Sequence, residues 1–256
     1  MTIADTAFSI AEVRAAEAEL PPKERLFDDP YARHFLAAGA HAREATERYL
    51  SLPFFRDGIR LRTRFIDDEV RAALRAGARQ LVLLGAGFDA RGMRLAEAMT
   101  AGVMTFEVDT PEQLGRKRAC LEAAGIALPA SVRQVHFDFA ASRLDGPLGA
   151  RLVEAGWSST QRTVFVWEGV IGYIDSEAID DSLRFMARAG RVGARVIFTF
   201  AEANLDPVPA AERVRRAGFT SFEEVGLDEV WRRLLAGEPH LAASYARMGV
   251  ANAAPG

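Results

Sequence analysis

From residue 80 onward, short apolar runs alternate with stretches of helical periodicity. The apolar runs have the length of buried strands, and glycine or polar residues bound them. We expect strands at Leu81–Leu84, Val103–Asp109, Val132–Phe139, Arg162–Trp167, Ala194–Phe200, Phe219–Val225 and Ser244–Ala251. Strands that alternate with helices in this way predict one doubly wound α/β sheet.

The helical stretches between these strands carry start and stop signals. We expect helices from the polar residues after Gly87 to about Met99, from Thr110 to Gly125, from Asp175 or Ser176 to Gly190, and over Leu227–Leu235. Thr110 is a typical N-cap residue, and Pro111 suits the first helical position. Glycine is typical of the position just after a helix, where Gly125 and Gly190 stand.

Residues 1–76 show no strand pattern and predict a helical cap on the sheet. We expect helices over Ala4–Leu20, over Ile59–Ala76, and after Asp28-Asp29-Pro30, where an aspartate caps the helix and Pro30 takes its first position. The chain is therefore expected to be one domain, with the cap at 1–76 and the sheet at 77–256.

Arg62 lies on the apolar stripe of the expected helix Ile59–Ala76, one turn before Ile66, whereas Arg64 lies about 200° further round. An arginine on an inward stripe is costly unless it meets an anion. The alternative places Arg62 at the rim of the stripe with its guanidinium in water.

The composition, 49% hydrophobic and 26% charged over 256 residues, is that of an ordinary globular protein with a full core. A net charge of −3 gives no reason to expect nucleic acid or an anionic membrane as a partner. Cys120 is the only cysteine, so we expect neither a disulfide nor a cysteine-based metal site. The first residues lack the features of a signal peptide, and no long apolar span follows; a cytoplasmic protein is expected.

The segment Gly85-Ala86-Gly87 follows the first strand and predicts a ligand-facing corner. Two glycines let the backbone turn sharply without a Cβ in the way of a ligand, and the following helix directs free N–H groups toward it. Gly85, Gly87 and Ala90 also fit the dinucleotide fingerprint when its last position is Ala. A plain strand–turn–helix without a ligand is the alternative.

Acidic residues stand at the ends of three expected strands: Asp109, Asp138 and Glu168. The carboxyl ends of parallel strands meet at one edge of the sheet, where ligands of such folds bind. Asp109 lies 22 residues after Gly87, at the position of a carboxylate that accepts ribose hydroxyls. For Asp138 a solvated loop residue is an equal alternative, and an unpaired Glu168 would be costly beside its apolar strand.

Five ordered motifs make the chain resemble the leucine carboxyl methyltransferase family, which includes the tetracenomycin-type polyketide carboxyl methyltransferases. The motifs are Asp28-Asp-Pro-Tyr-Ala32, Arg62-Thr-Arg64 with Ile66-Asp67, Leu84-Gly-Ala-Gly-Phe-Asp-Ala-Arg91, Phe106-Glu-Val-Asp-Thr-Pro111 and Val166-Trp-Glu-Gly-Val-Ile-Gly-Tyr173. The resemblance covers most of residues 8–200. It implies a Rossmann-like class I methyltransferase with a seven-stranded sheet, an antiparallel last strand and S-adenosylmethionine as cofactor.

The resemblance also implies the binding roles. Arg62 would hold the methionine carboxylate of the cofactor, Asp109 its ribose, and Glu168 would lie beneath its methionine part, within reach of the α-ammonium. The other implied cofactor contacts are Arg14, Gly85, Ala86, Gly87, Asp138 and Phe139. The chain departs from the family pattern after Phe200, because only residues 201–218 stand where relatives carry a long helical lid.

The expected reaction is O-methylation of a carboxylate on a small natural product or carrier-bound acid, which leaves S-adenosylhomocysteine. An ionised carboxylate needs no base, whereas a phenol acceptor would be helped by one. Tyr173 and His240 are the candidate catalytic residues, beside His34, His41 and His136. The alternatives are a phenol or hydroxyl O-methyltransferase, a nicotinamide oxidoreductase, and a methyltransferase-like protein that binds the cofactor for another reaction.

Overall fold

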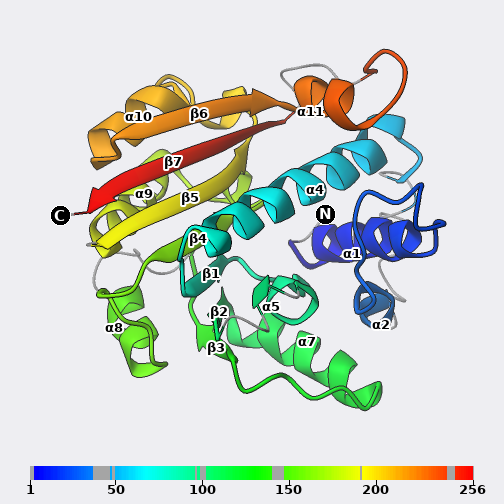
Figure 1. The fold of residues 1–256 in the computed structure, drawn as a ribbon, viewed down its shortest axis with the longest axis horizontal. Coiled ribbons are helices and arrows are strands. Elements are labelled where there is room, and N and C mark those ends of the chain that lie inside the picture. Colours follow the sequence, from blue (N-terminus) through cyan, green and yellow to red (C-terminus); the bar gives the residue numbers. More distant parts are fainter. Residues whose placement is uncertain are drawn as a thin grey trace.

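A seven-stranded sheet organises the computed structural model, which describes residues 3–36, 47, 50–95, 97–98, 102–139, 147–190, 192–240 and 246–255. The strand order is β3-β2-β1-β4-β5-β7-β6 (Figure 1). The strands are β1 (Gln80–Leu84), β2 (Met104–Asp109), β3 (Val132–His136), β4 (Thr163–Trp167), β5 (Val192–Phe200), β6 (Ser221–Gly226) and β7 (Arg247–Pro255). Among these seven strands, β7 alone runs opposite to the other six, so the expected class I sheet is confirmed.

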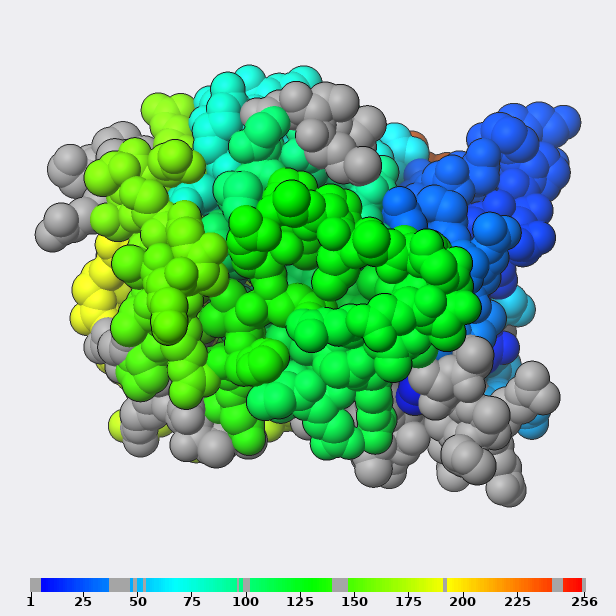
Figure 2. All heavy atoms as spheres, turned by 90° about the horizontal axis from the view of Figure 1, so that it is seen from below, coloured from blue at the N-terminus to red at the C-terminus, as the bar shows by residue number. Residues whose placement is uncertain are grey.

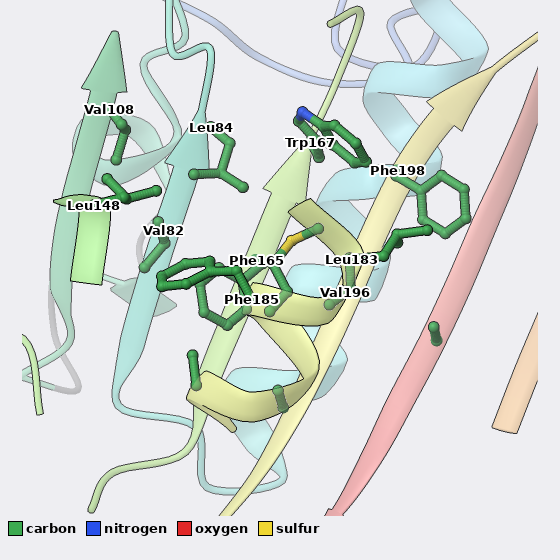
Figure 3. Packing of buried hydrophobic residues seen from close by; sticks show 14 of the residues in the cluster. Val82, Leu84, Val108, Leu148, Phe165, Trp167, Leu183, Phe185, Val196 and Phe198 are labelled. Atoms are coloured by element: carbon green, nitrogen blue, oxygen red, sulfur yellow. The ribbon is translucent and has the colours of Figure 1, made fainter. Parts of the chain in front are cut away.

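Helices cover both faces of the sheet, because alternate residues of its buried strands point to opposite sides. Val82 and Leu84 pack with α8 (Pro147–Glu154), α9 (Ser176–Ala189) and α10 (Ala210–Ala217) on one face. Figure 3 shows Leu183 and Phe185 of α9 against the side chains of β1, β4 and β5. On the other face Leu81 and Leu83 pack with α4 (Pro53–Arg75) and α11 (Leu227–Leu234).

The N-terminal helices pack in two different places. Ile66 and Val70 of α4 share a hydrophobic cluster with the strands, so α4 belongs to the helical layer that covers this face of the sheet. The expected boundary between cap and sheet, after residue 76, passes through that cluster. The helices α1 (Ile3–Ala18) and α2 (Ala32–Phe35) instead pack around Phe88 and toward α7 (Pro111–Ala123). Figure 2 shows the blue N-terminal residues beside the green surface of residues 110–160.

Several expected boundaries were wrong. The helix after the glycine corner, α5, covers only Arg91–Arg94, because Leu95 is extended (φ −81°, ψ 110°). Pro30 precedes α2 instead of opening it, although Asp29 does accept hydrogen bonds from the Tyr31 and Ala32 amides. The third strand ends at His136, not at Phe139.

Other differences concern a helix that begins earlier than expected and elements that were not expected at all. The helix α4 starts at Pro53, six residues before the expected Ile59. The helices α8 and α10 and the 3-10 turns η2 (Ile171–Tyr173) and η3 (Glu202–Asn204) were not expected. The last strand continues to Pro255, and Ser244 lies outside the described residues. No helix in the described ranges is both long and apolar enough to cross a bilayer.

Candidate functional site

A cavity of about 520 Å³ opens at the carboxyl ends of β1, β2, β3 and β4. Its walls come from the glycine corner, the strand ends, the first turns of α7, and the helix α1, which lies across it. All the expected cofactor-binding residues line it, and so does the catalytic candidate Tyr173; the cofactor-binding residues are Arg14, Arg62, Gly85, Ala86, Gly87, Asp109, Asp138, Phe139 and Glu168. The fold therefore gathers them in one place, while their contacts with a cofactor stay predictions.

The glycine corner turns as the sequence predicts. Gly85 and Gly87 have positive φ angles of 68° and 49°, which favour glycine. A Cβ on Gly85 would lie 2.4 Å from Cγ2 of Val170, so this position is closed to side chains for a second reason. The amides of Gly85 and Ala86 both donate to the Val108 carbonyl, which fixes the turn against β2.

Asp109 ends β2 and braces this corner. Its Oδ2 accepts a 2.7 Å hydrogen bond from the Gly87 amide, and its Oδ1 accepts one of 2.7 Å from the Thr110 amide. Burial raises the pKa of Asp109, and these two hydrogen bonds act against that rise. A carboxylate oxygen accepts more than one hydrogen bond, so both oxygens retain capacity for a ligand hydroxyl.

Glu168, just after β4, is surrounded by three arginines from three helices. Arg62 Nε of α4 donates to Oε1 at 2.8 Å, Arg91 Nη1 of α5 donates to Oε2 at 2.7 Å, and Arg14 Nη2 of α1 donates to both oxygens at 3.2–3.3 Å. Burial alone raises the pKa of Glu168, but the charges of Arg91, Arg14 and Arg62 hold it well below its usual range. The carboxylate is therefore ionised, and its neighbours in the protein already pair with it.

Arg62 points inward, as its helical phase predicts, and the anion that it meets is Glu168. Its Nη2 and the Nε of Arg14 are buried without hydrogen-bond partners. Arg64 pairs instead with Asp68 and with the Leu26 carbonyl, and it does not line the cavity. Arg62 and Arg14 thus each carry one buried N–H group without a partner, next to a carboxylate that is already shared.

A second buried charge network lies behind Glu168 and was not predicted. Asp67 accepts from Arg91 Nε at 2.7 Å and from both terminal nitrogens of Arg94 at 2.6–2.7 Å. Arg91 also contacts Asp89 at 2.5 Å, and Arg94 lies 3.5 Å from Asp29. Three of the five sequence motifs supply Asp29, Asp67, Asp89 and Arg91, whereas Arg94 lies outside all five. The motifs were therefore a usable signal for most of the network, although they do not reveal which charge meets which.

The first turns of α7 add wall residues that sequence reasoning missed: Glu112, Gln113 and Arg116. The sequence feature that could have pointed to these three residues is their position on the helix that directly follows Asp109. At the same end of the cavity, Asp138 and Phe139 lie after β3, and the Phe139 ring packs edge-on against Phe137 at 5.2 Å.

Tyr173 and His240, the catalytic candidates, are far from equivalent. Tyr173 lines the cavity and is 43% exposed, and its hydroxyl lies 3.0 Å from Thr6 Oγ1, which joins η2 to α1. The structure does not bring His240 to the cavity: the ring packs edge-on against Trp231, with Nε2 3.1 Å from Asp57 Oδ2. The α4–α11 packing that places it there is not visible in the local sequence.

The other two described histidines, His34 and His136, do not line the cavity either. His34 contacts Arg33, His136 is exposed at the end of β3, and His41 lies outside the described residues. In the part of the chain that the structure describes, no histidine lines the cavity, and no group of three or more His, Cys, Asp or Glu is placed to hold a metal ion.

Residues 7–187 match a family model described as leucine carboxyl methyltransferase. A relative in Frankia alni, named as a candidate S-adenosyl-L-methionine-dependent methyltransferase, is 40% identical over 178 residues, which are 68% of this chain and 60% of that protein. A relative of the same description in a Parafrankia species is 36% identical over 197 residues, 75% of this chain and 61% of that protein. The chain thus spans about 60% of the length of these curated relatives.

Solved structures show the same fold at low sequence identity. A candidate methyltransferase from Thermobifida fusca has a TM-score of 0.55 at 13% identity, over 99% of this chain and 95% of that one. A DUF574 family protein from Streptomyces avermitilis has a TM-score of 0.52 at 16% identity, over 96% and 97%. At such identities the likeness concerns the fold alone.

Proposed function

The chain belongs to the leucine carboxyl methyltransferase family, and we propose that its cavity binds S-adenosylmethionine for transfer of the methyl group to an oxygen acceptor. The proposed acceptor is a carboxylate on a small molecule or a carrier-bound acid. The observation that carries the proposal is the set of residues that line one cavity: two arginines that each carry an unpaired N–H group, the glycine corner, and Asp109 with its carboxylate.

The residues of the cavity fit the proposed cofactor part by part. The unpaired Nη2 of Arg62 and Nε of Arg14 suit a carboxylate, which accepts charged hydrogen bonds. The glycine corner lets a ligand approach the backbone, and Asp109 offers acceptors to ribose hydroxyls. A volume of about 520 Å³ lies within the usual range for small-molecule and cofactor sites.

The bound cofactor would supply a methyl group on a positive sulfonium: as the acceptor oxygen bonds to the methyl carbon, the carbon–sulfur bond opposite it would break and S-adenosylhomocysteine would leave. The protein's own task is to hold the partners in line and to exclude water, which accounts for up to about 7–11 kcal/mol of a barrier. A carboxylic acid ionises near pH 4, so a carboxylate acceptor needs no proton removed at neutral pH. The cavity wall agrees with this chemistry, because no histidine lines it within the described residues.

Ligand titration tests the cofactor assignment. Isothermal titration calorimetry should detect S-adenosylhomocysteine binding and no binding of NAD at the same concentrations. Binding of NAD and not of S-adenosylhomocysteine would overturn the proposal in favour of an oxidoreductase.

The acceptor class is tested by the stability of the methylated product. Protein would be incubated with methyl-labelled S-adenosylmethionine and a panel of aliphatic and aromatic carboxylic acids and phenols. A methyl ester releases volatile labelled methanol in mild alkali, whereas an aryl methyl ether does not. Label that resists alkali would identify a phenol or hydroxyl acceptor and exclude the carboxylate.

A further inference from the structure

One part of the cavity wall takes no part in the cofactor contacts proposed above. It comes from the helix α1 and from the turn η2 with its two flanking residues, and we call it the α1–η2 wall: Thr6, Ala7, Ile10, Val170, Tyr173 and Ile174. Residues four apart share one face of a helix, so α1 turns the face that bears Thr6, Ile10 and Arg14 toward the cavity.

The α1–η2 wall stands beside the glycine corner. A Cβ on Gly85 would lie 2.4 Å from Cγ2 of Val170, which follows Glu168 by two residues, and the Gly87 amide donates to Asp109. The corner therefore lies between the proposed methionine and ribose ends of the site. The sulfur of S-adenosylmethionine joins these two parts of the cofactor, so the acceptor must reach this middle region.

The polar groups of the α1–η2 wall are two hydroxyls. Thr6 Oγ1 and Tyr173 Oη lie 3.0 Å apart, and one of their two O–H groups is enough to form that hydrogen bond. The second O–H group remains to donate to a ligand oxygen, and both side chains are partly exposed. The other four residues of the wall are apolar.

The arginines among the described residues of the cavity wall all contact carboxylates of the protein. Arg14 and Arg62 pair with Glu168, and Arg116 pairs with Glu112. The α1–η2 wall itself contains no charged residue, so a second charge on an acceptor would find no counter-ion there, and its burial would be costly. An uncharged apolar body would instead gain free energy by packing against this wall.

We propose that the α1–η2 wall binds the methyl acceptor and that this acceptor is a carboxylic acid with an uncharged, apolar body. The Thr6–Tyr173 hydroxyl pair donates to the carboxylate oxygen that does not react, and Ile10 packs against the body. Thr6 and Ile10 of α1 thereby determine which acids bind. This inference rests on the proposed function and deepens it, because it names the class of acid.

Two six-carbon acids test the class of acceptor. Ligand-observed NMR titration would give the dissociation constants of hexanoate and adipate for protein saturated with S-adenosylhomocysteine. Hexanoate should bind at least about tenfold more tightly, because adipate brings a second carboxylate to a wall without a counter-ion. Adipate binding as tight as that of hexanoate, or no hexanoate binding at millimolar concentrations, would overturn the inference.

Substitutions on α1 test the two specificity residues. Thr6→Val removes one hydroxyl at nearly constant volume, and Ile10→Ala removes apolar contact. Each should raise the dissociation constant of hexanoate about three- to tenfold, the scale of one neutral hydrogen bond or of a methylene group. Thr6→Ser keeps the hydroxyl and should bind hexanoate as wild type does.

Val13→Ala is the matched control on the same helix. Val13 is buried and does not line the cavity, so its truncation should lower the unfolding temperature without changing hexanoate binding. All four variants should bind S-adenosylhomocysteine within about twofold of wild type, which shows that each still folds. Equal losses of hexanoate affinity in Ile10→Ala and Val13→Ala, or no loss in Thr6→Val and Ile10→Ala, would refute the specificity role of α1.

The outcomes separate this inference from the proposed function. If wild type binds S-adenosylhomocysteine but not hexanoate, the inference fails and the proposed cofactor site stands. If wild type binds no S-adenosylhomocysteine, the proposed function fails, and the acceptor wall fails with it.

Discussion

Two independent constraints require glycine at position 85: its backbone is left-handed, and Val170 leaves no room for a Cβ. Gly125 has almost the same φ angle, 70° against 68°, with nothing within 4 Å of its Cβ position. Gly125→Ala should therefore cost about 1–2 kcal/mol of backbone strain. Gly85→Ala should cost about 1–3 kcal/mol more from overpacking against Val170.

Urea unfolding of the two alanine variants measures this difference, and titration with S-adenosylhomocysteine measures its effect on the site. Binding should weaken only in Gly85→Ala, because Gly125 lies outside the cavity wall. Equal losses of stability in the two variants would show that Val170 moves aside at no cost.

Arg62 and Arg64 stand two residues apart on α4 and face different surroundings. Arg62→Ala removes from the cavity wall a guanidinium that carries an unpaired N–H group, and charged hydrogen bonds contribute about 1.5–3 kcal/mol. The dissociation constant of S-adenosylhomocysteine should therefore rise about ten- to a hundredfold in Arg62→Ala and less than about twofold in Arg64→Ala. An equal or larger effect at Arg64 would refute the assignment of the methionine carboxylate to Arg62.

At the scale of elements, Glu168 joins β4 to the helices α1, α4 and α5 through Arg14, Arg62 and Arg91. Glu168→Gln leaves three buried guanidinium groups without that charge, and loss of one partner from a buried ion pair costs about 3–5 kcal/mol. The free energy of unfolding at pH 7 should fall by about that amount.

The pKa of Glu168 is lower in the folded chain than its ordinary value of 4.5. Its ionised form therefore stabilises the fold above pH 4.5, and this contribution is lost as pH falls below that value. The gap in unfolding free energy between wild type and Glu168→Gln, measured in urea from pH 7 to pH 4, should narrow on the acid side. A gap that stays constant would exclude this linkage.

Glu212→Gln is a matched control at the surface, where the carboxylate of α10 pairs with Arg215 and Arg216. Surface ion pairs contribute little, because solvent and salt screen them. This variant should unfold at nearly the same urea concentration as wild type throughout the same pH range. A loss as large as that of Glu168→Gln would indicate that burial is not what gives Glu168 its effect.

At the scale of the whole molecule, the proposed carboxylate acceptor and the lack of histidine among the described residues of the cavity wall lead to one kinetic expectation. Single-turnover methyl transfer should be nearly independent of pH between about 6 and 9, since no acceptor proton must be removed. Alanine variants of His34, His41, His136 and His240 should each keep most of their activity. A loss of several orders of magnitude at one histidine, in a variant that still binds S-adenosylhomocysteine, would contradict the base-free mechanism.

Much of this architecture follows from the sequence, because strand length, helical period and turn residues are local properties. The apolar run before Gly85 predicts β1, and the phase of α4 separates Arg62 from Arg64. The acids at strand ends converge because parallel strands present their carboxyl ends at one edge. These properties were sufficient to gather most of the candidate site without coordinates.

Only the tertiary structure decided which charges meet and where helices stop. Asp67 pairs with Arg91 and Arg94 because α4 crosses the sheet beside the glycine corner, and α5 is a single turn there. Three helices converge on Glu168 for the same reason, and α4–α11 packing carries His240 away from the cavity. Such pairings depend on how helices pack across the sheet, which no local pattern contains. The amino-acid sequence by itself therefore determined the strands and the edge of the sheet at which the candidate site lies, and packing determined the partners of each side chain.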